Sequence, residues 1–240
     1  MRKLGVAAVC GLLAVAAATA IAQTTTSPPP VKVGAKVTPS KAGTRHHPQG
    51  VKLNTTINWE QLGSSAQPIV QTFDVLFPKG SLYNGGKIKS CSYGRLNAGG
   101  PTACPKASIV GSGTGNAYAD TVITHPTITV VNGGKNKIFF FTVLNNPARV
   151  QSPVVGNITK MSGKYAYKLH VVVPTLLQFV AGVPIELTQL HVTVGKGSYL
   201  STTSCGPGGK WPFSITTGYL TSAGTPDGSA SDTASIPCRK

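Results

Sequence analysis

VKLNTTINW, residues 51–59, is the stretch that decides the fold. Its odd-numbered positions hold Val, Leu, Thr, Ile and Trp, and its even-numbered positions hold Lys, Asn, Thr and Asn. Successive side chains of a β-strand point to opposite faces, so this alternation predicts a strand with one buried and one solvated face. An amphipathic helix would instead repeat its apolar residues every three or four positions.

The same alternation recurs along the chain. Strands are expected at residues 51–59, 73–77, 127–131, 138–144, 165–173 and 190–194. The turn-forming sequence NGGKN (132–136) joins two of them and predicts a hairpin. No segment carries a helical apolar stripe, although residues 174–183 have room for one helical turn. We therefore expect an all-β fold, an antiparallel β-sandwich that is jelly-roll-like or immunoglobulin-like. The chain lacks the Cys–Trp–Cys spacing of a true immunoglobulin domain.

Composition supports this class of fold. The chain has 240 residues, with 22 Lys and Arg against 6 Asp and Glu, and a formal net charge of +16. Charged residues make up only 12% of the chain, whereas Gly (28) and Pro (18) are abundant. Few charges and many turn-forming residues argue against a coiled coil, a helical bundle or a charge-rich disordered protein.

Residues 1–22 have the organisation of a secretory signal peptide. Arg2 and Lys3 form a positive start, an apolar run follows to Ala20, and Ala20-Ile21-Ala22 is a small-x-small cleavage pattern. The alternative is a retained anchor, since the run approaches the ~20 residues that span a bilayer. We expect cleavage before Gln23, and a secreted or cell-envelope location.

Residues 23–50 are expected to form a basic, Pro/Thr-rich linker, and residues 51–240 the β domain. The linker has no apolar periodicity and no aromatic residue, so it cannot bury enough surface to offset the ordering of the chain. Two interpretations remain open for it, a segment drawn to anionic polymers or membranes and a solvated spacer.

Cleavage of the signal removes Cys10 and leaves Cys91, Cys104, Cys205 and Cys238. An even number of cysteines in an exported chain predicts two disulfides, with three possible pairings. We expect the pairs closest in sequence, Cys91–Cys104 and Cys205–Cys238. A four-cysteine zinc site would need closely spaced pairs, which the chain lacks.

The sequence assigns no catalytic residue, cofactor or metal site. Its few carboxylates are expected on polar strand faces or in loops, and DGSASD (227–232) is interpreted as a surface loop. His170 and His191 occupy outward strand positions and are interpreted as exposed histidines without a carboxylate partner. The glycine-rich run 111–115 opens no helix, so it is interpreted as a bend rather than a phosphate loop.

Aromatic residues suggest one candidate ligand platform. Trp211 follows two glycines, and Tyr199 and Tyr219 flank it in sequence. An exposed aromatic face would stack on the apolar side of a sugar ring, as in carbohydrate-binding modules. The alternative is that Trp211 packs against the disulfide expected at Cys205.

One run of residues resembles a known group of proteins. Cys104-Pro-Lys-Ala-Ser-Ile-Val-Gly-Ser-Gly113, together with the export signal, the basic tail and the terminal Pro237-Cys238, is similar to uncharacterised secreted proteins of high-GC actinobacteria. The resemblance implies an extracytoplasmic β domain. It implies no activity and no site residue.

Three functions follow as hypotheses. The leading one is a non-enzymatic secreted or cell-envelope protein that binds an anionic envelope polymer or membrane surface through diffuse positive charge. Its lysines are spread over many strands and turns, which does not suit sequence-specific nucleic-acid recognition. The alternatives are a carbohydrate-binding module that uses the aromatic platform, and an envelope hydrolase.

Overall fold

The computed structural model describes residues 30–59 and 69–239. The expected signal peptide, Cys10, Glu60 and the start of the expected linker lie outside this range. The strands are β1 (Val31–Thr38), β2 (Gln49–Trp59), β3 (Ile69–Pro78), β4 (Ser81–Tyr83), β5 (Ile109–Ala119), β6 (Val122–Thr124), β7 (Thr127–Asn132), β8 (Lys137–Leu144), β9 (Val150–Lys160), β10 (Tyr165–Val172), β11 (Phe179–Val180), β12 (Val183–Val194), β13 (Leu200–Thr202), β14 (Lys210–Leu220) and β15 (Pro226–Pro237). The helices are α1 (Tyr93–Gly99) and α2 (Thr175–Gln178).

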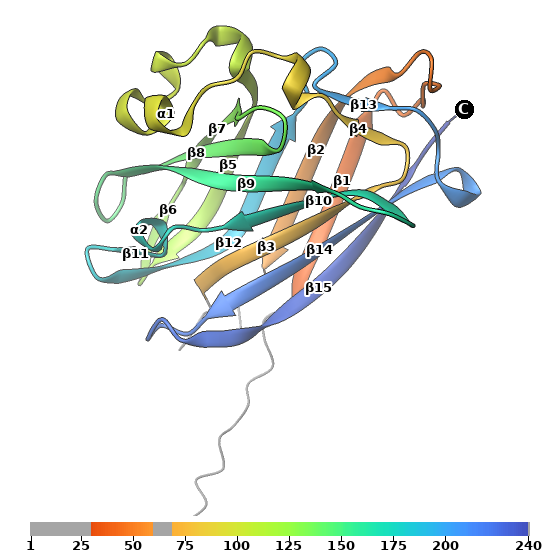
Figure 1. Cartoon of the computed structure of the whole chain (residues 1–240). Helices are drawn as coiled ribbons and strands as arrows, with labels where there is room; N and C mark the ends of the chain where they lie inside the picture. Colours follow the sequence, from red (N-terminus) through yellow and green to blue (C-terminus); the bar gives the residue numbers. More distant parts are fainter. Residues whose placement is uncertain (1–29, 60–68, 240) are drawn as a thin grey trace, which may run out of the picture.

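All these strands belong to antiparallel pairings, in the order β15-β14-β3-β10-β9-β8-β7-β5-β12-β2-β13-β4, with β1 on β2, β6 on β5 and β11 on β12. The sheet folds back so that β9, β10, β3, β14 and β15 face β5, β12, β2 and β1 across the core (Figure 1). The all-β sandwich prediction is confirmed. So are the hairpin, now β7–β8, and the helical turn, now α2.

β1, which pairs with the outer side of β2, lies beside the edge strand β15 at what we call the seam. They run in the same direction, and a parallel bridge joins Lys41 to Arg239. The Ala42 N–H donates to the Arg239 carbonyl, and the Arg239 N–H donates to the Ser40 carbonyl, both at 2.8 Å. Further along, the Val33 N–H donates to the Asp232 carboxylate at 2.8 Å. A side chain therefore caps an edge amide of β1.

A second layer covers part of the outside of the sheet. Residues 84–108, here called the α1 layer, pack Leu96 and the Cys91–Cys104 disulfide onto Val131, Phe139 and Phe141. The neighbouring side chains Val130, Ile138 and Phe140 point into the main core instead. Because both faces of β7 and β8 are buried here, the run IFFF (138–141) loses the alternation that marks the other strands.

Three sequence interpretations need correction. Val31–Thr38 is a strand paired along its length with β2, so the flexible-linker prediction is wrong there and the β domain begins earlier than residue 51. Residues 227–232 lie in β15 and not in a loop. Residues 111–115 lie within β5 and not in a bend, where a Cβ at Gly111 or Gly113 would collide with backbone carbonyls of β12.

Candidate functional site

The three aromatic residues of the predicted platform are inside the protein. Trp211 and Tyr219 are each 1% exposed, and Tyr199 is 0% exposed. The Trp211 indole N–H donates to the Ser204 carbonyl at 3.0 Å, and burial raises the pKa of Tyr219 to about 12, although hydrogen bonds with Thr217 and Trp59 act the other way. An exposed stacking platform at these positions is thus ruled out: Trp211 and Tyr219 occupy inward positions of β14, and Tyr199 is buried in the connection between β12 and β13.

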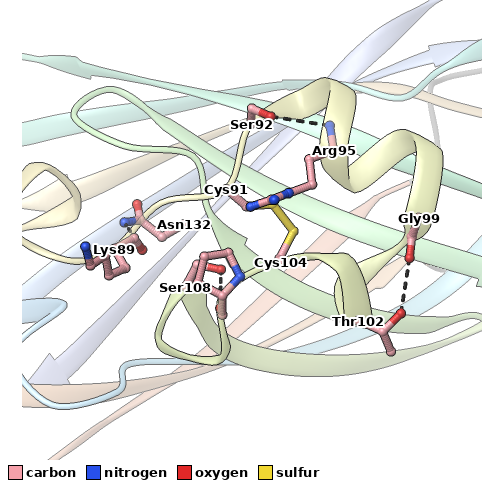
Figure 2. The surroundings of a disulfide bond; sticks show 10 residues. Lys89, Cys91, Ser92, Arg95, Gly99, Thr102, Cys104, Ser108 and Asn132 are labelled. Atoms are coloured by element: carbon pink, nitrogen blue, oxygen red, sulfur yellow. Dashed lines mark hydrogen bonds between the residues drawn. A yellow bond between two sulfur atoms is a disulfide. The ribbon is translucent and has the colours of Figure 1, made fainter.

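Both predicted disulfides are confirmed. Their Cα–Cα distances are 5.5 Å for Cys91–Cys104 and 5.6 Å for Cys205–Cys238, within the reach of a disulfide. Figure 2 shows the first bond beside α1, where the Ser92 hydroxyl accepts the Arg95 N–H at the start of the helix. Two disulfides are typical of an oxidising, extracytoplasmic compartment.

The basic residues gather at one end of the sheet, here called the basic end. The pairing registers place the start of β8, β10 and β14 beside the end of β3, β9, β12 and β15. This end carries, on its strand tips and turns, Lys36, Lys41, Arg45, Lys52, Lys79, Lys87, Lys89, Lys106, Lys135, Lys137, Lys160, Lys164, Lys168, Lys196, Lys210 and Arg239. Every one of them is exposed except Lys168, which is half-buried.

The opposite end of the strands has a different composition. Asp120, Glu186 and Asp227 lie there, beside the end of β5, the start of β12 and the start of β15. The basic residues at this end are Lys32 and Arg149 among the residues that the structure describes. The net positive charge of the molecule is therefore polarised along the strand direction, and not diffuse as the sequence suggested.

Two lysines at the basic end line a surface hollow. This basic hollow, of about 270 Å³, is formed by Lys79, Ser81, Lys160, Met161, Ser162, Gly163, Tyr165, Ala166 and Tyr167. None of the described residues that line it is a carboxylate. The Lys79 N–H donates to the Lys164 carbonyl at 3.2 Å, which joins the β3–β4 turn to the β9–β10 turn; both turns project at the same end (Figure 1).

An apolar interior cavity of about 190 Å³ lies between the two halves of the sheet. Its walls are mostly aliphatic and aromatic side chains from β2, β3, β8, β10 and β12. Ser81 and Tyr167 line both this cavity and the basic hollow, so the two spaces adjoin at the basic end.

Polar side chains of the cavity are concentrated near the same end. The Tyr199 hydroxyl donates to the Tyr83 hydroxyl at 3.2 Å, and burial raises the pKa of Tyr83 to about 12. Thr202 is 4% exposed, and its hydroxyl oxygen is buried with no hydrogen-bond partner among the described residues. Thr202 is paired with Ser81 across β13 and β4.

One histidine has a carboxylate partner that the sequence did not indicate. The His170 Nδ1 lies 2.7 Å from Asp74 Oδ1, and Lys168 Nζ lies 2.8 Å from Asp74 Oδ2. Desolvation acts to raise the pKa of Asp74, but hydrogen bonds and charge from Lys168 and His170 outweigh it and lower the pKa. Within residues 30–59 and 69–239 the hydrogen bond recorded for the His170 ring is the one to Asp74.

His191 lies on another strand and its Nδ1 is 3.0 Å from the Thr56 hydroxyl. β10 and β12 are not neighbours, so the two histidines are not brought together. In the described part of the chain, no group of three or more His, Cys, Asp and Glu side chains is placed to hold a metal ion.

Comparison of the chain with protein-family models and with curated protein sequences finds no match. None of the helices within the described ranges is long and apolar enough to cross a membrane.

Proposed function

We propose that the protein is a non-enzymatic extracytoplasmic binding protein that attaches to an anionic surface or polymer of the envelope through its basic end. The observation that carries this proposal is the polarised charge: basic side chains crowd one end, and the acids there are few. Crowded like charges repel one another, so such a cluster is best compensated by an anionic partner.

The energies involved are sufficient for attachment. A basic residue close to an anionic surface contributes about 1 kcal/mol, and the contribution is screened by salt. Exposed lysines at strand ends and turns, such as Lys135, Lys160 and Lys196, can approach a flat partner without any change in fold. The basic end would then face the partner surface, and the strands would point away from that surface.

Co-sedimentation of the full chain with anionic phospholipid vesicles, and separately with polyphosphate, tests the proposal. Reversing two lysines at the basic end, in Lys135→Glu/Lys137→Glu, should weaken binding by about tenfold or more. The matched control, Lys32→Glu/Arg149→Glu, changes the net charge equally at the opposite end and should weaken binding much less.

Binding should also fall steeply as salt rises. Equal losses in the two double variants would show that the charge acts diffusely and would contradict the role of the basic end. Binding that is insensitive to salt, or absent from both partners, would contradict the proposed function itself.

A further inference from the structure

The lining of the interior cavity includes residues spread along most of β2. Residues Val51 to Ile57 of β2 contribute to its wall at alternate positions. Six residue steps of a strand span about 20 Å. An extended alkyl chain can run beside such a wall within a space of about 190 Å³.

The chemistry of the wall selects an apolar occupant. Side chains such as Leu53, Phe73 and Leu190 line the cavity, and hydrogen-bonding groups are few along most of its length. A cavity of about 150 Å³ lined by such residues stays dry and binds apolar molecules. Burying each methylene group of a ligand there contributes to binding through the hydrophobic effect.

The adjoining basic hollow supplies positively charged and polar groups. Lys79 and Lys160 line it, and Ser81 and Tyr167 connect it to the cavity. Thr202 lines the cavity and is paired with Ser81, which lines both spaces, and its buried hydroxyl has no hydrogen-bond partner among the described residues. Ammonium groups and a hydroxyl donor are the groups that bind a carboxylate or a phosphate.

We propose that the protein binds a single-chain anionic amphiphile, with its alkyl chain in the interior cavity and its carboxylate or phosphate headgroup between Lys79 and Lys160. This ligand site adds to the surface attachment proposed above and does not depend on it.

Titration calorimetry with dodecanoate and with dodecyl phosphate tests the site in the full chain. Saturable binding of one ligand per chain is expected for at least one of them, and the stronger of the two identifies the headgroup. Dodecanol should bind more weakly, and dodecyltrimethylammonium should not bind, because both lack the anionic group. Saturable binding of the cation with equal strength would overturn the proposal.

Two variants test the headgroup site and the alkyl-chain site separately. Lys79→Glu/Lys160→Glu should weaken binding of the anionic ligands by about tenfold or more. The matched control Lys135→Glu/Lys137→Glu, at the same end but outside the hollow, should bind them as the native chain does. In the cavity, Val75→Phe should abolish binding of the ligand by filling the space that the chain occupies.

A spin-labelled ligand keeps the test decisive if Val75→Phe does not fold. A label at the end of the alkyl chain should broaden the methyl signals of interior residues such as Leu190, and not those of the exposed Val122 and Ile123. Broadening confined to exposed methyl groups would overturn the proposal.

The two proposals fail in different ways. Vesicle binding should fall in both lysine variants, whereas amphiphile binding should fall only in Lys79→Glu/Lys160→Glu. Loss of vesicle binding in both variants with no amphiphile binding by the native chain would leave the surface function standing and remove the ligand site.

Discussion

The seam and the α1 layer each contain one disulfide, but they connect different kinds of elements. At the seam, Cys205–Cys238 lies with Trp211, Phe213 and Ile236 in a cluster to which β1, β2, β14 and β15 contribute. In the α1 layer, Cys91–Cys104 fixes an irregular segment on the outside of β7 and β8. The seam joins strands far apart in sequence, whereas the layer folds onto a neighbouring hairpin.

The two regions also differ in the interactions that hold them to the rest of the fold. β1 and β15 run parallel and are not paired as a ladder, so the seam depends on apolar packing, on the disulfide and on single bonds such as that of Asp232. The α1 layer combines its disulfide and apolar packing with one buried amide. The Asn132 Nδ2 lies 2.9 Å, 3.0 Å and 3.1 Å from the carbonyls of Gly85, Ile88 and Lys89.

The largest expected effect is at the seam. Trp211→Ala should lower the free energy of unfolding by about 3–5 kcal/mol, because it removes a fully buried ring and leaves a cavity. Urea unfolding measures the loss. Hydrogen exchange should speed up in β1 and β15, whereas in Leu96→Ala it should speed up mainly in residues 84–108. The same exchange pattern in both variants would refute the distinction between the two regions.

Removing the disulfides compares the regions directly. By loop length, loss of the Cys205–Cys238 bond, with a sequence separation of 33, should cost about 4 kcal/mol, and loss of the Cys91–Cys104 bond, with a separation of 13, about 3 kcal/mol. The paired serine variants, followed by urea unfolding, measure both. A larger loss for the shorter loop would mean that native packing, rather than chain entropy, sets the order.

Asn132 tests the attachment of the α1 layer. Asn132→Ala should lower the free energy of unfolding by about 2–3 kcal/mol, since three buried or partly buried carbonyls lose their donor. Asn132→Asp is the control, because it preserves the shape and the acceptor oxygen but removes the donating NH₂ group. Thermal unfolding of both variants should show losses; a native-like Asn132→Asp would contradict the donor role.

The smallest effect is expected at Asp232. Asp232→Ala should cost about 1 kcal/mol, because the Val33 N–H at the edge of β1 loses its acceptor. Asp232→Asn retains an acceptor oxygen and should lose less. The exchange rate of the Val33 amide, measured by NMR, should rise in the alanine variant; an unchanged rate would show that the bond does not protect the edge.

Much of the fold was predictable because its information is local. Alternation placed the strands within residues 51–59, 73–77 and 165–173, and NGGKN (132–136) marked the β7–β8 hairpin. Where side chains are buried on both faces, as in IFFF (138–141), alternation weakens, and where a strand is rich in Thr, Gly or Lys, as in β1 and β5, it was missed. β1 forms through its pairing with β2 and its contacts at the seam, which are distant in sequence.

The candidate sites were less predictable, because each depends on which strands are neighbours. The partnership of His170 with Asp74 joins residues on β10 and β3, and no spacing in the sequence signals it. Trp211, Tyr199 and Tyr219 were recognised as notable aromatics, but only the packing shows that their rings face inward.

The sequence by itself determined the all-β class and the excess of positive charge, since these follow from period-two patterning and composition. It predicted two disulfides but left three pairings possible, and the structure decided between them. Only the tertiary structure decided where the positive charge lies on the molecule and where the interior cavity forms. The lysines follow strands scattered along the chain, and antiparallel register brings those strand ends to one side of the molecule. The cavity and its adjoining hollow exist because two halves of one sheet face each other, a relation that no local stretch of residues encodes.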